Sequence, residues 1–183
     1  MGVIKAIETH YAGCRFRSRL EARWAVMLDV SGIRWRYELE GLRVETPIGR
    51  INYLPDFWLP DARQWAEVKG HLEPEQIPRI TALAAGMGNC GEGHDTVFLG
   101  DIPRAASCRW PVQLHYHEGT LWAVGWDLRP GCPMSRPHLK VPPVPSEETA
   151  ELLIGGFWSG IPEWALAGLD RARAARFEWG EQG

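Results

Sequence analysis

The stretch that decides the fold is YLPDFWLPDARQWAEVKG, residues 53–70. Apolar and aromatic residues on either side of the turn at Pro60 are typical of two short strands joined by a reversal of the chain. Asp56 lies in the first strand, and Glu67 and Lys69 lie in the second. Because side chains alternate along a strand, Glu67 and Lys69 share one face, and the turn brings Asp56 beside Glu67. The sequence therefore predicts two carboxylates and a lysine at neighbouring strand ends.

The surrounding sequence predicts a mixed α/β arrangement. Helical spacing of apolar residues predicts a helix over 16–30 that ends at Ser31-Gly32. Alternating patterns and turn residues predict strands over 33–39 and 64–69. Between them, residues 42–45 start a hairpin whose returning strand covers 50–59. A helix over 74–85 and a strand over 96–99 complete the order helix, three strands, helix, strand, which is an α/β (α+β mixed sheet) core.

The pattern changes after residue 100. Residues 112–116 and 121–126 alternate around a Gly-containing turn and predict a hairpin. Six prolines between 129 and 146 predict a semi-rigid linker, and 147–180 return to helical spacing. We therefore divide the chain into a core (1–105), a β-hairpin extension of the core (106–128), a Pro-rich linker (129–146) and a C-terminal helical segment (147–183).

Composition excludes several classes of protein. The chain has 183 residues, of which 45% are hydrophobic and 23% charged, which fits one domain with a real core and excludes a disordered chain. No apolar run approaches the roughly 18 residues of a membrane helix, and no signal-peptide pattern starts the sequence. Four cysteines in a chain of this length do not make a disulfide scaffold, so we expect a cytoplasmic protein and no membrane partner.

The net charge of −3 argues at first sight against a nucleic-acid partner. The basic residues are uneven, however: arginine dominates, and only Lys5, Lys69 and Lys140 are lysines. Residues 1–50 hold nine basic and six acidic residues, a local balance of 9 − 6 = +3. A local basic stretch can guide a polyanion even when the whole chain is acidic. An Arg-rich solvated helix face is the plainer interpretation of the same residues.

Two converging carboxylates and a lysine suit a hard divalent cation such as Mg²⁺, which prefers oxygen ligands. Glu21 borders the apolar stripe of the first predicted helix and can supply a third carboxylate, which would permit a two-metal site. Structural roles are open for each residue alone. Asp56 can be a turn residue, Glu67 and Lys69 an exposed strand face, and Glu21 a partner of Arg17.

Four segments in this order resemble the PD-(D/E)XK nuclease superfamily, whose core is restriction-endonuclease-like: FRSRLE (16–21), GIRWRYE (32–38), YLPDFWLP (53–60) and EVKG (67–70). Within it they look most like the phage endonuclease I group of Holliday-junction resolvases. They are also similar to the endonuclease subunits of heteromeric transposases. The matching stretch runs from about residue 11 to residue 70, and the chain departs from the resolvases after residue 100.

The resemblance implies a metal-dependent DNA endonuclease that hydrolyses phosphodiester bonds with Mg²⁺-activated water, and Mn²⁺ would substitute. It implies that Asp56, Glu67, Glu21 and the Val68 backbone carbonyl are metal ligands. Lys69 would be the catalytic lysine, so the catalytic set is Glu21, Asp56, Glu67 and Lys69. It further implies specificity for branched DNA or Holliday junctions in DNA recombination, and a homodimer.

One alternative function stays open. The chain can be a nuclease-fold DNA-binding or assembly subunit without cleavage activity of its own.

We assign phosphate contacts to Arg15, Arg17 and Arg19, with Arg17 favoured because it lies four residues before Glu21. A structural zinc site at Cys90, His94, Cys108 and Cys132 is not expected, because the paired spacing of such sites is missing.

Overall fold

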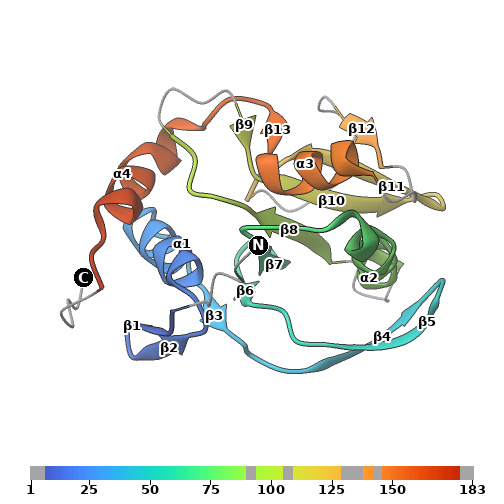
Figure 1. Ribbon diagram of the computed structural model, residues 1–183, viewed down its shortest axis with the longest axis horizontal. Coiled ribbons are helices and arrows are strands. Elements are labelled where there is room, and N and C mark those ends of the chain that lie inside the picture. The colour runs from blue at the N-terminus through green and yellow to red at the C-terminus, as the bar shows by residue number, and fades with distance from the viewer. Residues whose placement is uncertain (1–6, 90–93, 105–108, 129–137, 142–145, 178–183) are drawn as a thin grey trace.

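A seven-stranded mixed sheet forms the centre of the computed structural model, which describes residues 7–89, 94–104, 109–128, 138–141 and 146–177 (Figure 1). Its spatial order is β12-β11-β10-β8-β7-β6-β3. β7 and β8 are parallel, and the other neighbours are antiparallel. The predicted mixed α/β class is confirmed. The strands are β3 (Arg36–Tyr37), β6 (Phe57–Leu59), β7 (Gln64–Val68), β8 (Asp95–Leu99), β10 (Val112–His117), β11 (Thr120–Gly125) and β12 (His138–Lys140).

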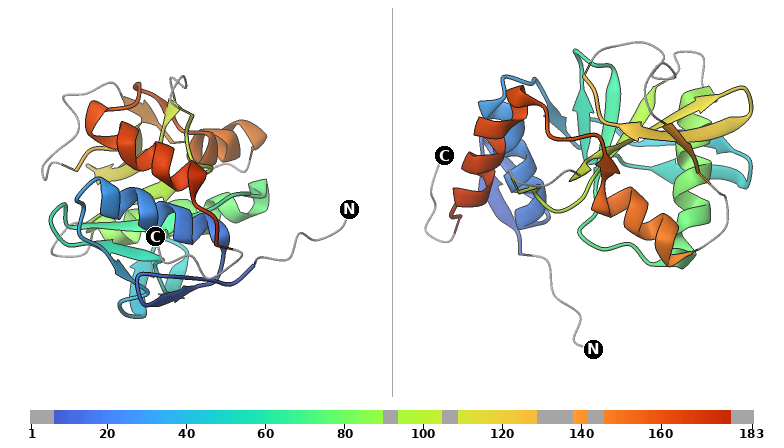
Figure 2. Two further views of the ribbon diagram at one scale, coloured as in Figure 1. Left: turned by 90° about the vertical axis from the view of Figure 1, so that its left-hand side faces the viewer. Right: turned by 90° about the horizontal axis from the view of Figure 1, so that it is seen from above.

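Helices cover both faces of the sheet (Figures 1 and 2). α1 (Arg19–Val30) and α4 (Leu166–Ala174) pack together on one face, and α2 (Ile77–Asn89) and α3 (Glu147–Gly155) lie on the other. The alternation along β8 fits this arrangement, because Val97 and Leu99 pack with α1 and α4, whereas Phe98 packs with α2 and α3. The molecule therefore has three layers with a core on each side of the sheet.

α1 begins later than its sequence pattern predicts. Ser18 is the N-cap and accepts a hydrogen bond from the Glu21 backbone N–H, so the predicted start at residue 16 is wrong. Phe16 instead ends β2 (Cys14–Phe16), which pairs with β1 (Thr9–Tyr11). Its ring packs on Tyr37 and Phe57, which explains why it continues the apolar stripe without being helical. The end at Ser31-Gly32 is confirmed, with Gly32 at φ +70°.

Two of the predicted strands are shorter than their alternating patterns. Only Arg36–Tyr37 of the predicted 33–39 strand pairs with β6. Glu38 follows at φ +44° and turns the chain out of the ladder, while its N–H donates to the Asp56 carbonyl oxygen at 2.9 Å. The predicted 50–59 strand is two elements: β5 (Gly49–Tyr53) pairs with β4 (Leu42–Thr46) in a separate hairpin, and β6 joins the main sheet.

The β4–β5 hairpin packs its buried face on α2. Val44, Ile51, Leu83 and Met87 are buried in one cluster there. The approach is close because Gly86 has no side chain: a Cβ at this position would lie 2.5 Å from the Glu45 carbonyl oxygen. Before α2, the short 3₁₀ turn η1 (Pro74–Gln76) gives the predicted Pro-Glu start, and α2 extends to Asn89 rather than ending at residue 85.

The region after residue 100 packs on the same central sheet. The β10–β11 hairpin continues the sheet from β8, as its alternation predicts. Of the predicted linker, residues 129–137 and 142–145 lie outside the described part, and β12 between them pairs with β11. The segment predicted to be helical from 147 to 180 is interrupted by β13 (Phe157–Trp158), which pairs with β9 (Arg109–Trp110), and by the 3₁₀ turn η3 (Glu163–Ala165).

No helix in the described ranges combines the length and the apolar composition that a membrane crossing requires.

Candidate active site

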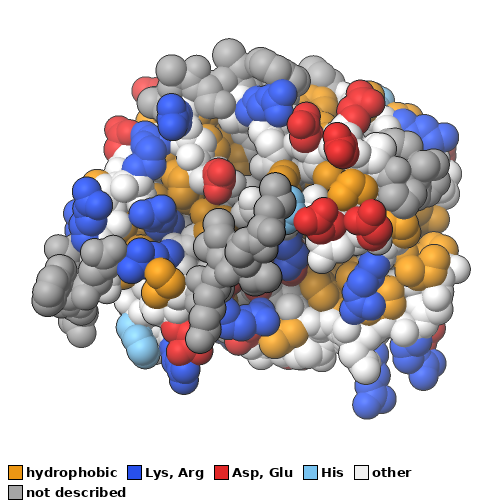
Figure 3. Space-filling view, viewed as in Figure 1, with side chains coloured by type: hydrophobic (Ala, Val, Ile, Leu, Met, Phe, Trp, Pro, Cys, Tyr) orange, Lys and Arg blue, Asp and Glu red, His pale blue; other side chains and the backbone are white. Residues whose placement is uncertain are grey.

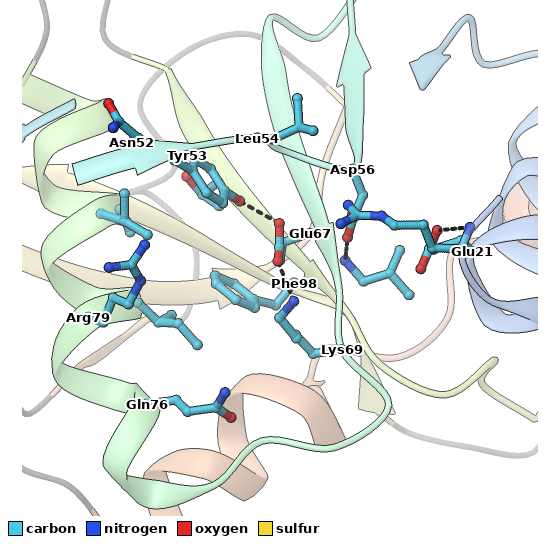
Figure 4. Close-up of a pocket in the computed structure, with 16 residues that line it drawn as sticks. Glu21, Asn52, Tyr53, Leu54, Asp56, Glu67, Lys69, Gln76, Arg79 and Phe98 are labelled. Carbon is cyan, nitrogen blue, oxygen red and sulfur yellow. Dashed lines mark hydrogen bonds and ion pairs between the residues drawn. The ribbon is translucent and has the colours of Figure 1, made fainter. Parts of the chain in front are cut away.

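A pocket of about 490 Å³ opens where β6 and β7 separate (Figure 4). Phe57 pairs with Ala66 in the β6–β7 register, so Asp56 comes opposite Glu67 just beyond the paired residues. α2 and the end of β5 form one side of the pocket, and the start of α1 lies on the other side (Figure 4). Its polar lining consists of Arg17, Glu21, Asn52, Tyr53, Asp56, Glu67, Lys69, Gln76, Arg79 and Thr96. All four predicted catalytic side chains therefore line one pocket.

Asp56 is held by the backbone of the neighbouring strand. Its Oδ2 accepts a hydrogen bond of 2.8 Å from the Val68 N–H, and the residue is only 4% exposed. Its Oδ1 accepts from Arg17 Nη2 at 3.0 Å. The structural alternative of a surface turn aspartate does not describe this residue, because the carboxylate is buried and points into the pocket.

Glu67 and Lys69 lie on the same face, as the strand period predicts. Lys69 Nζ lies 2.5 Å from Glu67 Oε1, and Tyr53 Oη donates to Glu67 Oε2 at 2.6 Å. Glu67 is 8% exposed, so these residues are not an exposed edge-strand face. β7 is an internal strand with partners on both sides, which fixes the direction of both side chains.

Glu21 has local partners at the start of α1. Its Oε1 accepts from Ser18 Oγ at 2.8 Å, and its Oε2 accepts from Tyr37 Oη at 2.6 Å and from the Arg17 backbone N–H at 3.1 Å. The alternative role of Glu21 as a partner of Arg17 therefore takes the form of a bond to the Arg17 backbone N–H. Ser18 also caps the helix by accepting from the Glu21 N–H at 3.2 Å, and an N-cap of this kind stabilises a helix start by about 1 kcal/mol.

The carboxylates influence one another electrostatically. Burial, and then the negative charge of Glu67, raise the pKa of Asp56 to about 7, against the opposing hydrogen bond from Val68 N–H. The charge of Glu21 raises it further, which ties this side chain to the same site. Burial and the adjacent Glu67 also raise the pKa of Tyr53, so its phenol is a hydrogen-bond donor at neutral pH. Burial and Glu21 raise the pKa of Tyr37 to about 12.

The predicted phosphate-binding arginines differ in position. Arg17 reaches the pocket and also lies 2.6 Å from Glu38 Oε1. Arg15 is outside the pocket lining and forms an exposed ion pair with Glu8, while Arg19 begins α1 and is half-buried. In the excluded zinc group, Cys90, Cys108 and Cys132 lie outside the described residues, and the His94 ring contacts Trp58 edge-on.

Sequence reasoning missed the residues on the α2 side of the pocket. Gln76 and Arg79 extend from η1 and α2 (Figure 4), and Asn52 of β5 lines the same pocket. Their signal was present, since residues 76, 79, 80, 83 and 84 recur at helical spacing and line the pocket together. The capping sequence Ser18-x-x-Glu21 was readable as well. Nothing in the sequence marked Tyr53 and Tyr37 as the partners of the two glutamates.

The donor chemistry of the pocket fits a hard divalent cation. Two buried carboxylates, Asp56 and Glu67, lie side by side; burial first and then the charge of Glu67 raise the pKa of Asp56, and a bound cation would offset both effects. Within the described ranges, no three histidine, cysteine, aspartate or glutamate side chains form a group able to hold a metal. Mg²⁺ is commonly bound through one or two carboxylates with water and substrate phosphate, so this pair suffices in number.

Comparisons with protein-family models, curated proteins and solved structures yield no match to this chain.

Proposed function

We propose that this protein is a metal-dependent DNA endonuclease built on a restriction-endonuclease-like core of the PD-(D/E)XK type. The observation that supports it best is the convergence of Asp56, Glu67 and Lys69 in one pocket at the divergence of β6 and β7. A second support is the order of the main-sheet elements, α1, β3, β6, β7, α2 and β8, which is helix, three strands, helix, strand.

In this proposal Asp56, Glu67 and the Val68 carbonyl hold Mg²⁺, with Mn²⁺ as a substitute, while Glu21 lines the same pocket without forming a three-carboxylate group with them. When bound, the ion supplies Lewis-acid stabilisation of the negative charge that develops on the phosphate. Lys69 is the cation of the protein closest to Glu67 and donates hydrogen bonds to the attacking water or to a phosphate oxygen. Tyr53 keeps the Glu67 carboxylate in position.

Charge distribution supports a polyanionic substrate. On the face drawn in Figure 3, basic side chains gather over α1 and α4 and along the β4–β5 hairpin, whereas acidic ones gather over α3 and the start of α2. The start of α1 and the end of β5 lie on opposite sides of the pocket, so basic groups are found on both sides of it, although the net charge of the chain is −3. Arg17, Arg79 and Lys69 supply positive charge within the pocket itself.

The finer proposal is cleavage of branched DNA such as a Holliday junction by a cytoplasmic homodimer, with Arg15 and Arg19 adding phosphate contacts outside the pocket. A twofold arrangement of two pockets matches a substrate with two symmetric cleavage sites. Light scattering of the purified chain tests the dimer, and a junction-to-duplex rate ratio above about tenfold is the expected mark of branch specificity.

The test of the proposed function is cleavage by the purified full chain. Supercoiled plasmid, linear duplex, single strand and four-way junction are incubated with Mg²⁺ or Mn²⁺, beside Asp56→Asn and Lys69→Met. Arg34→Met, which removes an exposed arginine paired with Asp61, serves as the matched control. We expect cleavage by wild type and control and loss of at least about 100-fold in both site variants. If the wild type and all three variants bind DNA but none of them cleaves it, the protein is instead a non-cleaving DNA-binding or assembly subunit.

A further inference from the structure

Arg17 lies on the one oxygen of Asp56 that the sheet backbone leaves open. Asp56 Oδ2 is taken by the Val68 N–H at 2.8 Å, and the Arg17 guanidinium lies 3.0 Å from Oδ1. The same Nη2 lies 2.6 Å from Glu38 Oε1. The guanidinium therefore places a fixed positive charge directly on the carboxylate to which the proposed function assigns a divalent cation.

The Arg17 side chain can leave while its backbone stays. The Arg17 N–H donates to Glu21 Oε2 at 3.1 Å and to Tyr37 Oη at 3.2 Å, which fixes the main chain just before α1. The side chain is 58% exposed, whereas that of Asp56 is 5% exposed. The exposed guanidinium can swing into water, and a cation that binds Asp56 would replace the positive charge that the buried carboxylate loses.

A guanidinium has only hydrogen-bond donors and keeps its charge at all working pH values, so it cannot join the cation as a ligand. Two cations at one carboxylate oxygen repel each other, and the repulsion is larger at a buried carboxylate than in water. A DNA phosphate in the pocket offers the guanidinium a bidentate partner, whereas one nitrogen, Nη2, now makes the contacts with both Asp56 and Glu38.

We propose that Arg17 competes with the divalent cation for Asp56 and moves onto a DNA phosphate when substrate binds, so that cation and DNA bind cooperatively. This inference rests on the proposed function and adds a regulatory role for one residue of its site. By thermodynamic reciprocity, the factor by which DNA strengthens cation binding equals the factor by which the cation strengthens DNA binding.

The experiment measures cation binding without DNA and without catalysis. Mn²⁺ is titrated into the full chain, and free Mn²⁺ is followed by electron paramagnetic resonance for wild type, Arg17→Met, Arg17→Lys and Arg34→Met. We expect Arg17→Met to bind Mn²⁺ about tenfold more tightly than wild type, with Arg17→Lys in between and Arg34→Met unchanged. Thermal melts of each variant show that the proteins compared are folded, and Arg17→Lys keeps the test available if Arg17→Met does not fold.

A second measurement follows DNA. Anisotropy of a labelled four-way junction is recorded with wild type and Arg17→Met, in EDTA and in Ca²⁺. We expect Arg17→Met to bind the junction more weakly in EDTA, and the gain in affinity from Ca²⁺ to shrink relative to wild type. Unchanged or weaker Mn²⁺ binding by Arg17→Met overturns this inference and leaves the metal site standing. If neither wild type nor Arg17→Met binds Mn²⁺, the proposed metal site fails together with the inference.

Discussion

Tyr53 Oη donates a hydrogen bond of 2.6 Å to Glu67 Oε2, so the last residue of the β5 strand holds a carboxylate of the central strand β7. The Tyr53 ring is partly exposed, but its hydroxyl is buried against the carboxylate. Lys69 occupies the other oxygen of Glu67 at 2.5 Å. The orientation of this carboxylate therefore depends on the separate β4–β5 hairpin as well as on its own strand.

We expect Tyr53→Phe to lower the cleavage rate about tenfold while leaving KM nearly unchanged, because the phenol orients Glu67 and does not touch DNA in our proposal. Loss of a buried hydrogen bond to a charged acceptor should also cost about 1–3 kcal/mol of folding stability. Steady-state kinetics and urea denaturation measure the two effects. Tyr116→Phe on β10, outside the pocket lining, is the matched control, and an equal rate loss there would contradict the positioning role.

The pH dependence of stability should depend on Asp56. Its pKa is raised in the folded protein to about 7, so its contribution to stability is fully present below pH ~4 and is lost as the pH rises through ~7. In EDTA, wild type should therefore lose stability relative to Asp56→Asn between pH 5 and pH 8. Adding Mg²⁺ should raise the melting temperature of wild type more at pH 8 than at pH 5, since the cation needs the ionised carboxylate. If the melting temperatures of the two proteins in EDTA changed equally between pH 5 and pH 8, the prediction would be refuted.

Arg79 should contribute to DNA affinity and not to metal affinity. It is an exposed residue that lines the α2 side of the pocket, across from Glu21 at the start of α1 (Figure 4). We expect Arg79→Met to weaken DNA binding by about tenfold and to reduce the slope of log K against log salt by about one. Mn²⁺ binding should stay at the wild-type value, in contrast to Arg17→Met. Arg34→Met is the charge-matched control. If Arg34→Met lost as much DNA affinity as Arg79→Met, the loss would be due to net charge alone.

Gly100 should not accept a side chain. A Cβ at this position would lie 1.9 Å from the Ile154 carbonyl oxygen at the end of α3, and backbone cannot yield as a flexible side chain does. The Gly100 carbonyl oxygen also accepts from Trp24 Nε1 at 2.8 Å, which links the same point to α1. We expect Gly100→Ala to cost about 2 kcal/mol or more, a fall in melting temperature of about 4–8 °C. Gly41→Ala, where a Cβ meets nothing within 4 Å, should melt close to wild type.

Much of the site was predictable because short-range chemistry fixes it. The turn after Leu59 and the period of β7 place Asp56, Glu67 and Lys69 without reference to the rest of the fold. The mixed α/β class was predictable as well, because segments with the strand period of two residues alternate along the chain with segments of helical period. The identity of the fold family stays a prediction, since it depends on motifs that no comparison tests.

The remaining features depend on tertiary contacts that leave little mark on the sequence. Alternation over 33–39 predicts a full strand, but the backbone at Glu38 turns left-handed to meet the Asp56 carbonyl. Phe16 continues a helical stripe, yet its ring is buried among aromatic residues from β3 and β6. The sequence around Tyr53 is that of an ordinary strand. Only the packing of β5 next to the main sheet brings the Tyr53 hydroxyl to Glu67.

The packing of α4 on α1 has a consequence for synthesis of the chain. Leu169 and Ala172 of α4 are fully buried in the core that contains Trp24 and Leu28 of α1. About 140 residues separate the two helices, so the ribosome must add this whole intervening stretch before α4 can pack on α1. We expect nascent chains that have emerged only through β8 to leave the apolar face of α1 open to chaperones. Full burial of α1, whose first turn carries Glu21, would then wait until α4 has been synthesised.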